Sequence, residues 1–200
     1  MADEKTYEYF KNHDFIIKGK YVGYVDAMWS QSGIGERDLF DRLVDLYAVS
    51  VIVGLRTGRR KPEDNSTDQK RTVQLQQISN SYKRFSTLMK IVLLIDDSRG
   101  LTTEEKVREA FDTSPKSEYK YNQNMELFNS YARGGIEYLY EKLVVRPSNL
   151  DDEEFTDARM SNIMALFNDD MQEIEDALLG VWKLCGKTHD RRPVVIGWFV

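Results

Sequence analysis

The side chains best suited to binding a ligand form a basic cluster at the end of an apolar segment. The cluster comprises Arg56, Arg59, Arg60 and Lys61, together with Lys70 and Arg71 beyond the polar stretch 62–69. Guanidinium groups on a turn can hold phosphates, and such complexes weaken as salt is added. These six residues are therefore the candidate contact surface for nucleic acid or for a partner protein. The alternative is a helix C-terminus that carries cations balanced by Glu63, Asp64 and Asp68.

Signatures of nucleophilic catalysis and of metal binding are missing from the sequence. His13 and His189 lie far apart, Cys185 is the single cysteine, and no HxxxH, HExxH or CxxC spacing occurs. Cys185 and His189 could face each other only if a helix continued through Gly186, so Cys185 is interpreted as a small buried side chain. The sequence also has no GxSxG elbow and no glycine-rich phosphate loop. We therefore expect no catalytic residue, no metal ligand and no cofactor.

One pair of acids leaves an enzymatic alternative open. Asp96 and Asp97 follow the apolar run Leu93–Ile95, where they resemble metal-binding carboxylates at the end of a strand. The preceding residues keep a helical phase, however, which favours a turn at this point. The alternative functions are a metal-dependent nuclease that uses Asp96 and Asp97, and an antitoxin-like regulatory protein whose acidic face binds a basic partner.

The apolar segment before the basic cluster has the phase of a helix. Its buried face consists of Leu39, Phe40, Leu43, Val44, Leu46 and Tyr47, and residues 49–55 leave almost no polar side. A helix that is hydrophobic all round must be buried. The sequence therefore predicts a mainly α fold, a single helical domain built round a buried central helix at about 36–56. Gly58 is placed to end this helix.

Helical spacing continues on both sides of the central helix. Helices are predicted over 3–12, over Tyr21–Ser30, once or twice within 70–95, from a Thr102–Glu105 capping box through Phe111, and over 119–145 with a break at Gly134 and Gly135. The tail PVVIGWFV is the one convincing strand-like piece, so a short C-terminal β segment can accompany the helices.

The composition is that of an ordinary globular protein. The 200 residues are 41% hydrophobic and 30% charged, and no apolar run is long enough to span a bilayer. No signal peptide opens the sequence, and a single cysteine gives no indication of an oxidising compartment. We therefore expect a cytoplasmic protein that makes no membrane contact.

The net charge of −5 is unevenly distributed along the chain. Residues 150–180 carry a net charge of −9, residues 181–200 carry +3, and the first 149 residues carry +1. We therefore expect a helical core domain at 1–149, followed at 150–200 by an acidic helical pair and an apolar tail packed on the same domain. The tail Val194–Val200 needs to dock on its own core or on a partner, and a second copy of the chain would form a homo-oligomer.

Two blocks of this sequence resemble a known family. The block LYAVSVIVGLRTGRRKPED contains Gly54, Arg56, Arg59 and Arg60, and the later block FNSYARGGIEYLYEKL contains Tyr131, Gly134, Gly135, Ile136 and Glu137. In these residues the chain resembles the small accessory proteins encoded beside DNA phosphorothioation (Dnd-type) modification and restriction genes in bacterial defence islands. The resemblance implies a component of a defence complex that acts on DNA, and it implies no catalytic residues.

Together these patterns predict a non-enzymatic helical accessory subunit of a bacterial anti-phage or restriction-type defence complex. Its basic turn would bind DNA or a DNA-bound partner. Its acidic C-terminal helices and apolar tail would contact other protein subunits of the complex.

Overall fold

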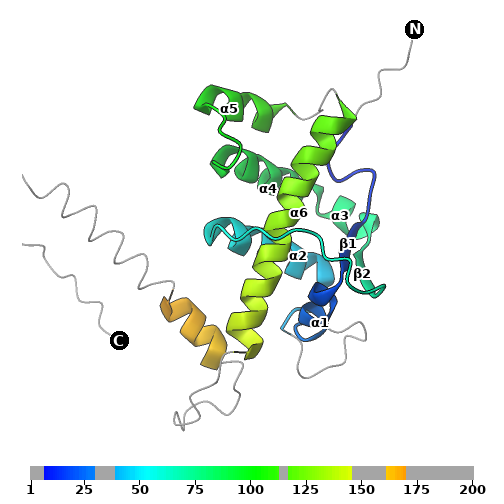
Figure 1. The fold of residues 1–200 in the computed structure, drawn as a ribbon, viewed down its shortest axis with the longest axis vertical. Helices are drawn as coiled ribbons and strands as arrows, with labels where there is room; N and C mark the ends of the chain where they lie inside the picture. Colours follow the sequence, from blue (N-terminus) through cyan, green and yellow to red (C-terminus); the bar gives the residue numbers. More distant parts are fainter. Residues whose placement is uncertain (1–6, 30–38, 113–116, 146–160, 170–200) are drawn as a thin grey trace, which may run out of the picture. The chain divides into compact units, whose positions relative to one another are not determined.

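The computed structural model describes residues 7–29, 39–112, 117–145 and 161–169. The chain divides into two compact units, Met1–Arg146 and Pro147–Val200. The first unit contains, in chain order, β1 (Phe15–Lys18), α1 (Lys20–Asp26), α2 (Leu43–Arg56), β2 (Lys70–Val73), α3 (Leu75–Asn80), α4 (Tyr82–Ile95), α5 (Thr103–Phe111), α6 (Glu118–Tyr140) and a π-helical turn η1 (Glu141–Val145) (Figure 1). In the second unit, residues 161–169 are helical. The predicted mainly α fold is confirmed.

Helix α6 is the element on which the first unit is assembled. Helices α1, α2 and α4 pack on α6, and α5 packs on α4 (Figure 1). The interior face of α6 includes Phe128, Ala132 and Ile136, which are fully buried. Among the described helices, none has the length and apolar character needed to cross a membrane.

Helix α2 differs from the predicted central helix in where it begins and in how deeply it lies. It begins at Leu43 and not near residue 36, because the amides of Leu39 and Phe40 donate hydrogen bonds to the carbonyl of Met28 and so hold the chain outside a helix. Its apolar circumference is also not buried all round, since Val49 and Ile52 remain 36% and 50% exposed. Helix α2 therefore lies against α6 with one side open.

The described strands are formed by residues 15–18 and 70–73, whereas the sequence predicts a strand at the C-terminal end of the chain. Strands β1 and β2 pair in antiparallel register, with Phe15 opposite Val73 and Lys18 opposite Lys70. Burial alternates along β1, because Phe15 and Ile17 are buried while Ile16 is exposed, as the two-residue period of a strand requires. The pair of helices predicted within 70–95 is confirmed as α3 and α4, and β2 occupies the first four residues of that range. The tail Val194–Val200 lies outside the described residues.

Residues 7–12 are not helical, contrary to the expectation for 3–12, and tertiary packing explains why. Phe10 adopts a φ of 62°, which no helix accommodates, and is buried. Its ring lies 5.4 Å from that of Phe85 on α4 and 5.0 Å from that of Phe128 on α6. Tyr47 on α2 joins this aromatic core, with its ring 5.3 Å from that of Phe85. Contacts of this kind outweigh the weak local preference of a short segment for helix.

Candidate binding surface: a basic strap on helix α6

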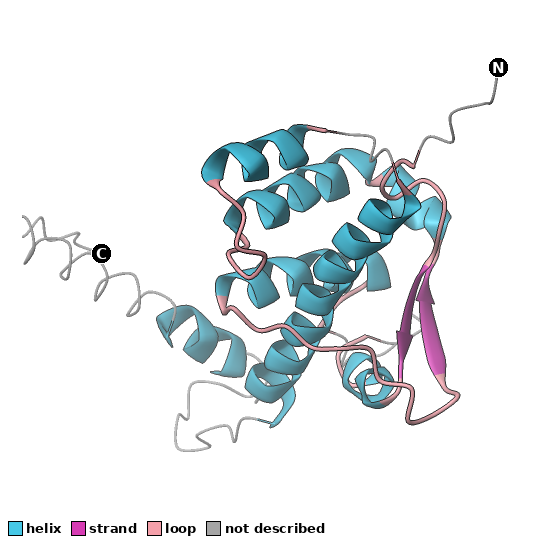
Figure 2. Ribbon diagram, turned by 45° about the horizontal axis from the view of Figure 1, so that its top comes forward, coloured by secondary structure: helices cyan, strands magenta, loops and turns pink. Residues whose placement is uncertain are grey.

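The connection from α2 to β2 carries three of the six residues of the predicted basic cluster and lies across α6 (Figures 1 and 2). Residues 57–64 of this connection form what we call the basic strap. It leaves α2 at Gly58, whose φ is 64°, while the amides of Gly58 and Arg59 donate to the carbonyls of Leu55 and Gly54. This pair of bonds is the Schellman arrangement that commonly ends helices, so the prediction that Gly58 ends the helix is confirmed.

Backbone hydrogen bonds fix the path of the strap on α6. The amide of Lys61 donates to the carbonyl of Ser130 at 3.0 Å, and Nε of Arg133 donates to the carbonyl of Lys61 at 2.9 Å. From α1, the hydroxyl of Tyr21 donates to the carbonyl of Pro62 at 3.2 Å. The side chains on the strap therefore project from a backbone held by two helices.

Three glycines allow the backbones of α2, the strap and α6 to come into direct contact. A Cβ atom would lie less than 3.0 Å from a carbonyl oxygen in each case: Gly54 against Tyr131, Gly134 against Arg59, and Gly135 against Ser50. The break predicted at Gly134 and Gly135 is therefore wrong, because α6 runs through both residues and uses them for close packing. The two blocks that carry the family resemblance pack directly on each other.

The cations of the strap are paired with carboxylates that lie on α6 or beside it. Arg59 Nη1 lies 2.6 Å from Glu141 Oε2, and its guanidinium lies 4.8 Å from the centre of the Tyr138 ring. Lys61 Nζ lies 2.6 Å from Glu137 Oε2, and Lys20 on α1 lies 2.6 Å from the other oxygen of Glu137. Glu137 thus links α1, the strap and α6.

Arg60 turns toward a buried carboxylate at the end of α4. Its Nη1 lies 3.6 Å from Asp96 Oδ1 and also donates to the hydroxyl of Ser98, while its Nε donates to Oγ of Ser130 at 3.2 Å. Asp96 also accepts a hydrogen bond of 2.7 Å from the hydroxyl of Tyr131. The guanidinium of Arg60 lies 5.6 Å from the Tyr131 ring centre.

The ionisation of this network follows from its contacts. Burial raises the pKa of Glu137, but the hydrogen bonds from Lys20 and Lys61 outweigh this effect and hold the pKa below its ordinary value of 4.5. Burial likewise raises the pKa of Asp96, and the hydrogen bonds from Tyr131, Ser98 and Arg99 lower it below 3.8. Burial and the hydrogen bond to Asp96 raise the pKa of Tyr131 to about 12. Both carboxylates are therefore charged at neutral pH, and the tyrosine is neutral.

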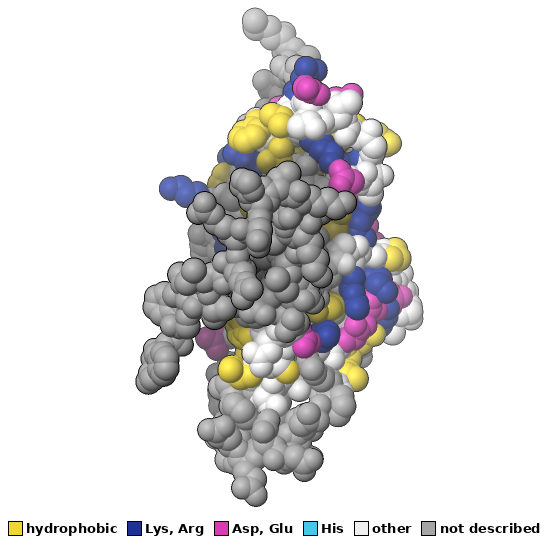
Figure 3. Space-filling model, turned by 90° about the vertical axis from the view of Figure 1, so that its left-hand side faces the viewer, with side chains coloured by type: hydrophobic (Ala, Val, Ile, Leu, Met, Phe, Trp, Pro, Cys, Tyr) yellow, Lys and Arg dark blue, Asp and Glu magenta, His cyan; other side chains and the backbone are white. Residues whose placement is uncertain are grey.

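The structure brings together only part of the predicted cluster. Arg59, Arg60 and Lys61 lie on the strap, Arg56 is the exposed last residue of α2, and Lys70 and Arg71 lie on β2. Arg71 forms a two-bond pair with Asp26, at 2.8 and 2.7 Å, and so belongs to a different contact. On the face seen in Figure 3, basic and acidic side chains are intermixed and do not form a patch of one sign.

The acids predicted to balance the cluster have other partners. Glu63 pairs with Lys18 at 3.1 Å, and Asp64 accepts a hydrogen bond from the amide of Lys20 at 2.7 Å. The actual partners, Asp96, Glu137 and Glu141, come from remote segments and were not predicted. The sequence around these three acids does not indicate that they pair with the basic cluster. The pairing depends on where the strap crosses α6, which only the fold determines.

Asp96 and Asp97 are not arranged as a pair of metal ligands. The Asp96 side chain is fully buried and bound by Tyr131, Ser98 and Arg99, whereas the Asp97 side chain is 94% exposed and paired with Lys106. No group of three or more His, Cys, Asp or Glu side chains among the described residues could hold a metal ion. Cys185, His189 and most of the acidic segment 150–180 lie outside the described residues.

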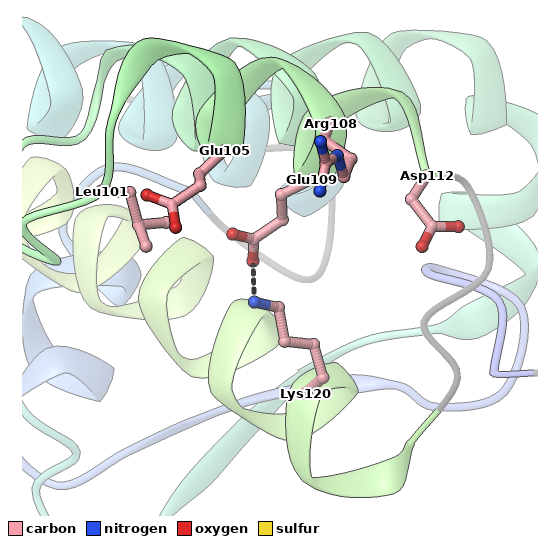
Figure 4. A pocket seen from close by; sticks show the side chains of 6 residues that line it. All are labelled: Leu101, Glu105, Arg108, Glu109, Asp112 and Lys120. Carbon is pink, nitrogen blue, oxygen red and sulfur yellow. Dashed lines mark ion pairs between the residues drawn. The ribbon is translucent and has the colours of Figure 1, made fainter.

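A separate pocket of about 250 Å³ lies between α5 and the first turns of α6. Its lining is Leu101, Glu105, Arg108, Glu109, Asp112 and Lys120 (Figure 4). Lys120 pairs with Glu109 at 3.1 Å across the pocket, and Glu105 is engaged in the cap of α5. Because Lys120 and Glu109 pair with each other and Glu105 caps its own helix, we take the strap, with its three partly exposed cations, as the candidate site.

Comparisons with protein families, with curated proteins and with solved structures found no match. The resemblance to Dnd-associated accessory proteins accordingly depends on the two sequence blocks alone.

Proposed function

We propose that the protein is a non-enzymatic helical accessory subunit of a bacterial anti-phage or restriction-type defence complex, and that the outer side of the basic strap binds DNA. The observation that carries the proposal is the presentation of three consecutive cations on a fixed backbone. The side chains of Arg59, Arg60 and Lys61 are each 39% exposed although each is paired. Side chains held in this way lose little further conformational freedom when they bind.

The strap keeps donors and charge for a phosphate. A guanidinium has five N–H donors, and the described contact of Arg59 with Glu141 uses one nitrogen. Asp96, Glu137 and Glu141 pair with Lys20, Arg59, Arg60 and Lys61, and Glu63 and Asp64 add two further carboxylates to the strap. A contact of the strap with the DNA backbone would therefore be modest and salt-sensitive.

Assignment to a defence complex is supported by the resemblance of the two sequence blocks. Both blocks contribute to one packed unit, in which Gly54, Gly134 and Gly135 allow the close approach and the side chains of Arg59 and Arg60 remain partly exposed. If the accessory role is right, the protein should co-purify from its native host with other subunits of such a complex.

The DNA contact is tested by removing the two arginine charges together. The double variant R59Q/R60Q should bind a labelled DNA probe more weakly in fluorescence anisotropy, and its salt slope should fall by about 1.8 for a duplex probe or about 1.4 for a single strand, because two phosphate contacts are lost. The matched control is R42Q/R84Q, which removes two exposed arginines that both pair with Asp45 away from the strap.

A third variant gives an effect of opposite sign. Glu141→Gln releases Arg59 from its carboxylate, so it should strengthen DNA binding if Arg59 contacts phosphate. Unchanged affinity and salt slope in R59Q/R60Q would overturn the DNA contact. Loss of a co-purifying protein subunit in that variant, with DNA affinity unchanged, would assign the strap to a DNA-bound partner.

A further inference from the structure

We infer that the ligand of the basic strap is single-stranded nucleic acid, with unpaired bases stacking on the partly exposed Arg59–Tyr138 pair on α6 and on the guanidinium of Arg60, which covers the buried ring of Tyr131. This inference rests on the proposed function and names the form of nucleic acid that the strap takes. It is carried by the position of the two strap arginines over tyrosine rings, at 4.8 Å for Arg59 over Tyr138 and 5.6 Å for Arg60 over Tyr131.

The crossing geometry of the strap produces these two pairs. Tyr131 and Tyr138 are seven residues apart on one helix, which places them on the same face about 10 Å apart. The strap crosses between them, with the carbonyl of Arg59 directly over Gly134. Arg60 therefore reaches back to the tyrosine one turn before the crossing, and Arg59 reaches forward to the tyrosine one turn after it.

The neighbouring side chains extend the same chemistry toward the end of α6. Lys142 Nζ lies 5.7 Å from the Tyr138 ring centre, and the half-buried rings of Tyr24 and Tyr140 are stacked 4.3 Å apart. This end of α6 therefore combines partly exposed tyrosine rings with Arg59 and Lys142, whose charges can contact a phosphate backbone. Stacking platforms beside cations are how proteins bind single strands without reading a sequence.

The charge balance of the site favours single strands over duplex. Asp96, Glu137 and Glu141 neutralise most of the strap cations, so phosphate contacts alone supply little binding free energy. A duplex hides the faces of its bases and could use only those phosphate contacts. An unpaired strand can add base stacking, which every base provides.

The inference is tested by fluorescence anisotropy with one labelled DNA sequence of about 16 nucleotides, offered as a single strand and as a blunt duplex. We expect the 200-residue protein to bind the single strand more tightly than the duplex. Tyr138→Leu should weaken single-strand binding about 5- to 100-fold and change duplex binding little. Tyr138→Phe keeps the ring and should bind as the wild type does.

Two further variants serve as a control and as a second test of stacking. Tyr119→Leu makes the same change on the same helix, at a tyrosine that is 77% exposed near the opposite end, and should leave both affinities unchanged. Arg59→Lys keeps the charge but loses the planar guanidinium, so it should weaken single-strand binding selectively and serves in place of Tyr138→Leu if that variant fails to fold.

The possible outcomes separate this inference from the proposed function. Equal or tighter binding of the duplex, or equal effects of Tyr138→Leu on both probes, would overturn the single-strand inference and leave the DNA-binding proposal standing. Binding of neither probe would overturn both.

Discussion

At the scale of single residues, glycines set how closely the two sequence blocks approach each other. Gly135 faces the carbonyl of Ser50, and any Cβ atom would overlap with it. Gly135→Ala should therefore force α2 away from α6 and lower the free energy of unfolding by at least about 2 kcal/mol in urea titrations. The matched control is Gly23→Ala on α1, where no atom lies within 4 Å of the new methyl group.

This control should change stability in the opposite direction. Alanine in place of an exposed helical glycine raises the free energy of unfolding by about 0.5–1 kcal/mol, because the unfolded chain loses freedom. A Gly135→Ala protein as stable as the wild type would show that α2 and α6 do not meet at these backbones.

A second residue-scale prediction concerns the pH dependence of stability. Burial raises the pKa of Glu137, but Lys20 and Lys61 lower it below its ordinary value of 4.5. A carboxylate with a lowered folded pKa contributes stability that is fully present above its unfolded pKa and is lost as the pH falls through its folded pKa. Stability should therefore fall more steeply in the wild type than in Glu137→Gln between about pH 5 and pH 3.

At pH 7 the Glu137→Gln protein should be less stable by about 1–2 kcal/mol, because the ion pairs with Lys20 and Lys61 are lost. The control Glu63→Gln removes a half-exposed partner of Lys18 and should cost less than about 0.5 kcal/mol. Urea unfolding at several pH values measures both. Parallel stability profiles for Glu137→Gln and the wild type would rule out a linking role for Glu137.

At the scale of elements, the sequence predicts those features that are encoded within one or two turns. The Thr102–Glu105 capping box begins α5, which ends at Phe111 as expected, and Gly58 ends α2. Both signals act through backbone groups within a few residues, so no knowledge of the fold is needed to interpret them. The turn expected at Asp96 also follows α4 directly.

Elements that depend on distant partners were not predictable in the same way. Strand β1 is a strand because Phe15 and Ile17 pack inward and pair with β2, more than fifty residues later. Two consecutive glycines usually indicate the end of a helix, yet Gly134 and Gly135 lie inside α6. The strap packs on Gly134 and α2 packs on Gly135, and neither contact leaves room for a side chain. In the candidate site, likewise, some residues can be predicted from the local sequence and others depend on the fold. Its cations are a local cluster in the sequence, whereas its tyrosines and carboxylates are assembled by the crossing of the strap and α6.

At the scale of the molecule, the hydrophobic core among the described residues lies in the first unit. The buried apolar residues of the described chain extend from Tyr9 to Leu143 and include the aromatic cluster of Phe10, Tyr47, Phe85 and Phe128. A chain of this length buries enough apolar surface to fold as one cooperative domain.

We therefore expect residues 1–146, expressed alone, to unfold in urea in one cooperative transition. Trp29 is the single tryptophan in this fragment, so its fluorescence and the helical circular dichroism report on the same unit. The two signals should share a midpoint if the fragment is two-state. Gly135→Ala in the fragment should lower that midpoint, because the contact of α2 with α6 lies wholly within it. Separate midpoints, or a broad transition without a baseline, would mean that residues 147–200 are needed to complete the fold.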